Sequence, residues 1–61
     1  MIENYFLNNC RKLQILITIY TINGYRQRGY VSAFDEKAIE LADEDGNHRL
    51  IYIHAISTIE T

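Results

Sequence analysis

The sequence predicts a mostly β protein in which one N-terminal helix precedes a small, strongly bent, five-stranded barrel. Three observations favour this fold: an apolar stripe at helical spacing near the N-terminus, five short strand-like segments at regular spacing, and a glycine inside the second segment. Small barrels need such bends to close. With 61 residues the chain has room for a single domain, residues 1–61.

The helix is expected at about residues 5–12. Asn4 is a suitable N-cap, and Arg11 and Lys12 fall in the last turn, where cations favour the negative end of the helix dipole. So short a helix is unstable alone and must dock on the rest of the chain. The apolar stripe that would make this contact consists of Phe6, Leu7, Cys10 and Leu13.

The barrel is expected at about residues 15–59. Residues 15–22 are rich in β-branched and aromatic types, and Asn23-Gly24 after them predicts a type I′ turn with positive φ at both positions. Gly29, inside the return strand 25–34, indicates a bend or bulge. The later strands are expected at 38–42, with Ile39 and Leu41 inward, at 48–53 and at 55–59, with an acidic turn at 43–47.

Alternation along the return strand predicts two different sides. One side would carry Arg26, Arg28, Tyr30, Ser32 and Phe34. The other side would carry Tyr25, Gln27, Gly29, Val31 and Ala33.

Composition excludes several classes of protein. About 48% of residues are hydrophobic and 23% charged, which is typical of a soluble globular chain, and no apolar run approaches the ~20 residues that span a bilayer. The first residues lack the basic start of a secretory signal, and the single cysteine, Cys10, cannot form an internal disulfide. We therefore expect a cytoplasmic protein with no membrane partner, in which Cys10 is a packed thiol.

The charge is distributed unevenly along the chain. The net charge is −2, but residues 1–34 hold four basic side chains against one acid, whereas residues 35–61 hold two against seven. The overall sign argues against strong nonspecific binding of polyanions, and the asymmetry allows one locally basic face. A chain this short also buries little surface, so association with copies of itself is the expected source of extra stability.

Three groups of residues resemble the Hfq family, the bacterial Sm-like RNA chaperones. The resemblance covers about residues 3–59 and implies an Sm-like (SH3-like) barrel, a homohexameric ring, and binding of small regulatory RNA and mRNA. Only three residues follow Thr58, so tail-mediated release of RNA is not expected. The matching groups are Phe6-Leu7-Asn8 with Arg11-Lys12, then Asn23-Gly24 with Gly29 and Phe34-Asp35, and finally Tyr52-x-His54-Ala55-Ile56-Ser57-Thr58.

The resemblance implies three RNA-binding surfaces. A distal face for adenine-rich RNA would use Tyr20, Gly24, Tyr25, Arg26 and Arg28; tyrosine can stack on bases and arginine can neutralise phosphate. Without the resemblance, packing between subunits is the favoured explanation of the same tyrosines. An outer rim that promotes annealing would use Asn8, Arg11, Lys12 and Phe34, although Gln14 stands where the family's fullest version has a third basic residue.

The third implied surface, a proximal face for uridine-rich RNA, departs from the family pattern. Glu3, Lys37 and Ile53 stand where the family usually has glutamine, an aromatic residue and lysine. His54 remains, and Lys37 is the nearby cation. We expect weakened uridine binding here. The substitutions also leave open a divergent paralogue that binds a partner or forms mixed rings with little RNA binding, and an incomplete ring.

No enzyme activity, cofactor or metal is expected. Asp35, His54 and Ser57 could suggest a catalytic group, but their spacing matches no nucleophile elbow, and the two histidines and scattered acids have no metal-ligand spacing. Asp35 is expected to hydrogen-bond the backbone or a neighbouring polar group instead.

Overall fold

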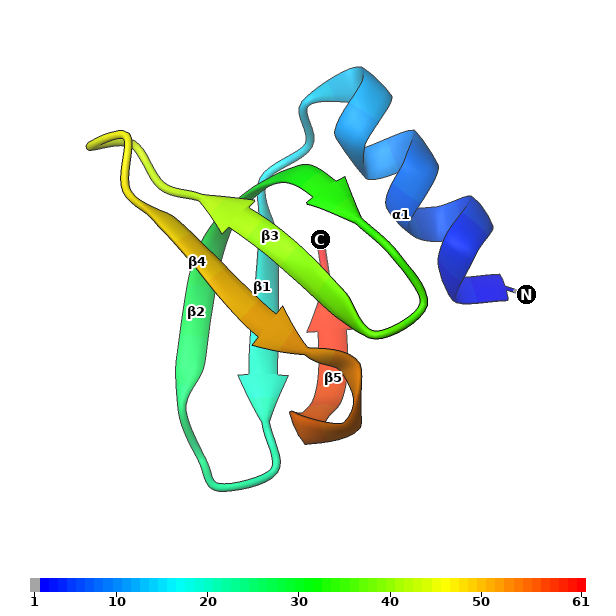
Figure 1. Cartoon of the computed structure of the whole chain (residues 1–61). Helices are drawn as coiled ribbons and strands as arrows, with labels where there is room; N and C mark the ends of the chain where they lie inside the picture. The colour runs from blue at the N-terminus through cyan, green and yellow to red at the C-terminus, as the bar shows by residue number, and fades with distance from the viewer. Residues whose placement is uncertain (1) are drawn as a thin grey trace.

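A computed structural model describes residues 2–61, and side chains from residue 4 onward. One N-terminal helix is followed by five antiparallel strands in a bent sheet of order β4-β3-β2-β1-β5, which confirms the predicted fold (Figure 1). The elements are α1 (Ile2–Leu13), β1 (Ile17–Thr21), β2 (Arg26–Phe34), β3 (Ala38–Ala42), β4 (His48–Tyr52), a 3-10 turn η1 (Ile53–Ala55) and β5 (Ile56–Glu60).

Strand β2 is the bent strand that joins the two halves of the barrel. Its first half pairs with β1 as far as Gly29, and its second half pairs with β3 from Tyr30 onward. A Cβ atom on Gly29 would lie 2.6 Å from the carbonyl oxygen of Ala42, so only glycine fits here. The prediction that Gly29 marks the bend is confirmed.

A change of register follows two residues later. The pairing of β2 with β3 shifts between Val31 and Ala33, which leaves Ser32 as an extra residue. The predicted alternation is therefore wrong beyond Val31. Ala33, expected on the same side as the buried Val31, is exposed, and Phe34, expected on the opposite side, is half-buried against the core.

The core joins the helix to both halves of the barrel. Leu7 and Cys10 of α1 are buried against the barrel, and Figure 1 shows α1 lying along one side of the curved sheet. Burial raises the pKa of the Cys10 thiol, which confirms a packed thiol. Ile39 and Leu41 point inward as predicted. The buried apolar cluster is Leu7, Cys10, Ile17, Ile19, Val31, Ile39, Leu41 and Ile51.

The helix is longer than predicted at its start, and Asn4 lies within it instead of capping it. Asn carries only a modest penalty inside a helix, so nothing in this segment stops the helix at residue 5. At the other end Gln14 adopts a positive φ of 52°. The N–H of Gln14 donates to the carbonyl of Arg11 and that of Ile15 to Cys10, a Schellman-type ending that delays β1 to Ile17.

The hairpin between β1 and β2 differs from the predicted type I′ turn. Gly24 has φ of +92°, but Asn23 does not have positive φ. The N–H of Gly24 donates to the carbonyl of Thr21, and the N–H of Thr21 donates to the carbonyl of Tyr25. This pattern is a three-residue loop with glycine at its left-handed position, the next commonest hairpin after the two-residue forms.

The last strands begin and end close to their predicted positions. Strand β4 ends at Tyr52, one residue early, because Ile53–Ala55 form η1; β5 therefore starts at Ile56. The N–H of Ile53 donates to the carbonyl of Lys37, which holds η1 against the end of the β2–β3 connection. In the part of the chain that the structure describes, the helix is too short and too polar to cross a membrane.

Candidate nucleic-acid interface

The outer side of β1 and β2 brings together three residues predicted for the distal face, and the adjoining hairpin adds the other two. Ile17 and Ile19 are buried, so Thr18 and Tyr20, which alternate with them, lie on the outer side of β1. In the β1–β2 register Tyr20 stands opposite Arg26, and Thr18 opposite Arg28. With the hairpin residues, these make what we call the tyrosine–arginine face: Tyr20, Gly24, Tyr25, Arg26 and Arg28.

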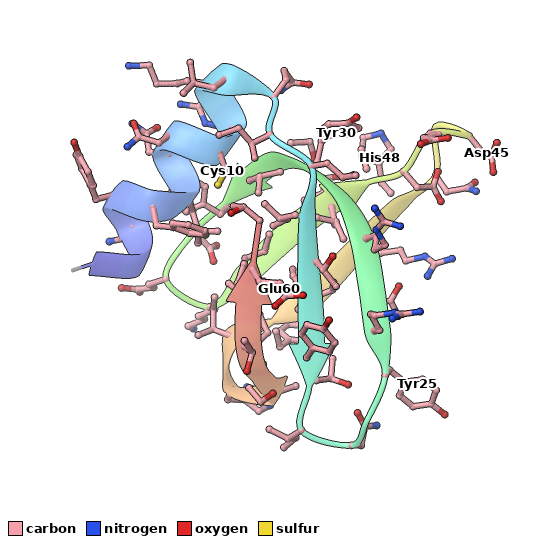
Figure 2. The ribbon with its side chains drawn as sticks, turned by 180° about the vertical axis from the view of Figure 1, so that it is seen from behind. Cys10, Tyr25, Tyr30, Asp45, His48 and Glu60 are labelled. Atoms are coloured by element: carbon pink, nitrogen blue, oxygen red, sulfur yellow. The ribbon has the colours of Figure 1, made fainter. Side chains whose placement is uncertain are left out.

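The hairpin presents an exposed aromatic ring at one end of this face. The backbone N–H of Tyr25 donates to Oγ1 of Thr21 at 3.0 Å, and that hydroxyl donates to Oδ1 of Asn23 at 2.6 Å. The loop is thus held by its own side chains, whereas the ring of Tyr25 is 64% exposed. Figure 2 shows Tyr25 pointing away from the hairpin into solvent.

Tyr20 is held by a contact that the sequence analysis missed. Its hydroxyl donates to Oε1 of Glu60 at 2.8 Å, across the β1–β5 pair. This hydrogen bond, followed by burial and the charge of Glu60, raises the pKa of Tyr20, while Arg26 opposes the shift. The alternation of Thr58 and Glu60 along the last strand could have placed both on one side, but only the register shows that Glu60 reaches Tyr20.

A third guanidinium lies beside the face and was also missed. Arg49 of β4 donates to Oε1 of Gln27, although the two residues belong to strands that do not pair. Arg26, Arg28 and Arg49 line one depression together with Asp43 and Asn47. The sequence separates Arg49 from the other arginines by more than twenty positions, and only the curvature of the sheet brings it to them.

Three of the four rim residues also meet. Nη2 of Arg11 donates to Oδ1 of Asn8 at 2.7 Å, and both line a shallow depression with Phe34 of β2. Lys12 is exposed at the helix end but does not line this depression. Gln14 uses its side chain to donate to the carbonyl of Arg11 at 2.8 Å, so it supports the end of the helix.

The residues predicted for the proximal face gather at η1, in what we call the proximal patch: Lys37, Ile53 and His54. The hydrogen bond from Ile53 to Lys37 brings the two segments together. His54 is exposed and stacks on Tyr52, with ring centroids 6.1 Å apart and planes inclined by 30°. Ile53 packs against the core. The side chain of Glu3 lies outside the described residues.

Asp35 has the structural role expected for it. Its Oδ1 accepts the N–H groups of Lys37 and Ala38, at 2.8 and 2.9 Å. These two hydrogen bonds, in that order, lower the pKa of Asp35. Among the side chains that the structure describes, those of residues 4–61, no group of three metal-ligating residues gathers.

The fold and this face define a class: a small bent β-barrel whose outer side offers aromatic rings and cations, the combination that single-stranded nucleic acids require. The family model described as "Hfq protein" matches residues 2–61. The chain belongs to the Hfq family, as its motifs predicted.

Similar proteins agree with this assignment. The RNA-binding protein Hfq of Alkaliphilus metalliredigens is 52% identical over 58 residues, which are 95% of this chain and 71% of that protein. The RNA-binding protein Hfq of Brevibacillus brevis is 49% identical over 57 residues, 93% of this chain and 71% of that protein. A 1.55 Å crystal structure of "the pleiotropic translational regulator, Hfq" matches with a TM-score of 0.93 and 31% identity, over 100% of both chains. These relatives are named for RNA binding, in agreement with the expectation of no enzyme.

Proposed function

We propose that this protein is an RNA chaperone that binds small regulatory RNA and mRNA, with adenine-rich RNA on the tyrosine–arginine face. The observation that carries the proposal is the pairing of Tyr20 with Arg26 across two strands, with Tyr25 exposed at the adjoining hairpin. With an aromatic ring next to a cation, the ring can stack on the base of a nucleotide while the cation binds its phosphate. Relatives named RNA-binding protein Hfq support this assignment.

The proposed mechanism is presentation without chemistry. Stacking contributes about 1–3 kcal/mol per base, so several copies of one face bind a strand firmly while each contact stays reversible. Two strands held on one assembly meet at a high effective concentration, which promotes their pairing. The rim formed by Asn8, Arg11, Lys12 and Phe34 is proposed to assist annealing, weakly because Gln14 adds no charge there.

The proposed assembly is a homohexameric ring. Strands β4 and β5 are the two ends of the sheet order, so each has an edge that pairing with another copy could complete. Leu50 and Tyr52 of β4 are more than half exposed, and an apolar depression borders β5. Its apolar lining is Phe6, Leu7, Ile53, Ile56 and Ile59. Exposed apolar surface on both edges supports association.

Uridine binding at the proximal patch is proposed to be weak. Lys37 cannot stack on a base as an aromatic ring does, and Ile53 packs against the core and offers no hydrogen-bond donor from its side chain. His54 is the one ring of the patch, and it is already stacked on Tyr52.

Measuring affinities for oligo-A and oligo-U of equal length at one salt concentration tests the proposal. We expect tighter binding of oligo-A than of oligo-U, weaker oligo-A binding in Arg26→Gln, and a salt dependence that becomes shallower in the same variant. Tight oligo-U binding that His54→Ala abolishes would contradict the assignment of faces. Absence of binding to both would favour the alternative, an interaction or mixed-ring protein.

A further inference from the structure

The outer side of β5, β1 and β2 has opposite charges at its two margins. Thr18 of β1 stands between Glu60 on β5 and Arg28 on β2, and Tyr20 stands between Thr58 and Arg26. Figure 2, which views the molecule from behind, shows Glu60 next to β1. From the arginine margin to the Glu60 margin is two strand spacings, about 10 Å. This distance is comparable to the span of one nucleotide from phosphate to base edge.

The tyrosine between these margins is held at its tip by the acid. The 2.8 Å hydrogen bond from its hydroxyl occupies Oε1 of Glu60. Among the described residues, Oε2 of Glu60 accepts no hydrogen bond from another side chain or from the backbone. An ionised carboxylate is only an acceptor, so Oε2 is available to a donor that arrives with a ligand and repels a phosphate or a carbonyl oxygen.

These charges specify how a nucleotide would lie across the face. Its phosphate belongs with Arg26 and Arg28, because Glu60 repels it from the β5 margin. Its base, stacked on the Tyr20 ring, then has its edge toward Glu60. Adenine and cytosine present an exocyclic amino group, which can donate a hydrogen bond to a carboxylate. Uracil presents a carbonyl oxygen at the equivalent position, and a carboxylate repels it.

We propose that Glu60 is a specificity-determining residue of the tyrosine–arginine face, selecting bases that carry an exocyclic amino group and orienting the RNA with its phosphates on the β2 side. The inference rests on the proposed function and adds to it the group that reads the base. Glu60 also acts as a positioning residue, because it fixes the ring on which the base stacks.

The test compares two oligonucleotides of equal length, oligo-A and the same strand with purine riboside in place of adenosine. Purine riboside keeps the stacking surface and lacks only the amino group. For the unmodified protein we expect oligo-A to bind about tenfold tighter, the value of one hydrogen bond to a charged group. In Glu60→Ala the ratio of the two affinities should fall to about one. The ratio is the readout because removal of a negative charge alone strengthens both affinities together.

Two further variants complete the design. Glu44→Gln removes one negative charge from the exposed acidic turn, which borders the face at Arg28 and not at the Glu60 margin, and should leave the ratio at its original value. Tyr20→Phe keeps the ring but removes the hydroxyl that hydrogen-bonds Glu60. This variant should still bind both oligonucleotides, and the ratio of the two affinities should be smaller than in the unmodified protein. Circular dichroism confirms that each variant is folded.

The outcomes separate this inference from the proposed function. A ratio near one already in the unmodified protein, or an unchanged ratio in Glu60→Ala, would overturn the role of Glu60 while RNA binding stands. Failure of the unmodified protein to bind either oligonucleotide would overturn both.

Discussion

The tyrosine–arginine face and the proximal patch are two surfaces of one barrel that differ in the chemistry of their side chains. On the face, Tyr20 lies opposite Arg26, so aromatic and cationic groups are neighbours. On the patch, Lys37 supplies a cation and Ile53 an apolar side chain that belongs to the core, while the ring of His54 is stacked on Tyr52. The contrast teaches that one barrel can carry side chains suited to stacking and phosphate binding on one surface and side chains unsuited to them on another.

Hydrogen bonds to the main chain hold the backbone of the proximal patch in place. The N–H of Ile53 binds the carbonyl of Lys37, and Asp35 binds the N–H groups of Lys37 and Ala38, so this corner holds η1 and the start of β3 in place. These contacts use main-chain atoms and the Asp35 carboxylate, none of which depends on the side chains of Lys37 or Ile53. Substitution of Lys37 should therefore leave the barrel intact, whereas the side chain of Ile53 also packs against the core.

The largest expected effect is loss of stacking on the tyrosine–arginine face. Tyr25→Ala removes a ring that is 64% exposed and should weaken oligo-A binding by about 5- to 150-fold, since stacking contributes about 1–3 kcal/mol per base. Fluorescence anisotropy measures the change. Tyr5→Ala, which removes a ring of α1 that is 75% exposed, is the matched control and should bind oligo-A normally.

The next effect concerns the junction that holds the two halves of the barrel. Gly29→Ala places a Cβ against the carbonyl of Ala42 and should lower the free energy of unfolding by about 2 kcal/mol, as overpacking does. Urea denaturation measures it. Gly24→Ala meets no atom within 4 Å but has positive φ, so its cost of about 1 kcal/mol should be smaller. Equal costs would mean that close approach at Gly29 is not what requires glycine.

The contrast between the two surfaces would be reduced most directly by giving the proximal patch a stacking ring and a hydrogen-bond donor. The double variant Lys37→Phe with Ile53→Lys returns a stacking ring and a donor, and should raise oligo-U affinity about fivefold, at the lower end of one stacking contact. Oligo-A affinity is the internal control and should not change. If oligo-U binding stays weak, the loss of these side chains is not the reason for it.

The smallest expected effect is the pH dependence of the corner at Asp35. Its pKa is lowered from the ordinary 3.8 by the N–H groups of Lys37 and Ala38, so the ionised form stabilises the fold above that value. That stabilisation is lost as the pH falls through the lowered pKa. Asp35→Asn should therefore reduce the urea midpoint at pH 7 and differ less from the unmodified protein at pH 2. Glu36→Gln, at the adjacent exposed position, should leave the midpoint unchanged at both.

The sequence predicted the fold, the inward residues Ile39 and Leu41, and the bend at Gly29, because periodicity and a glycine in a strand are local signals. It also predicted the helix face except at Leu13, which is 70% exposed and does not join the core. It did not predict the bulge at Ser32, which exposes Ala33, or the left-handed Gln14 that ends α1. Both depend on how a segment meets the rest of the chain. Glu60 and Arg49 were not predicted for the same reason. Their contacts with Tyr20 and Gln27 follow from strand order and the curvature of the sheet, which no local pattern encodes.

Light scattering with and without an adenine-rich oligonucleotide tests the central claim, that copies of this barrel present the tyrosine–arginine face together to RNA. We expect about six times the 7.2 kDa mass of one subunit, and a complex that includes the oligonucleotide and dissociates as salt rises. A folded particle of one subunit mass, unchanged when the oligonucleotide is added, would contradict the account.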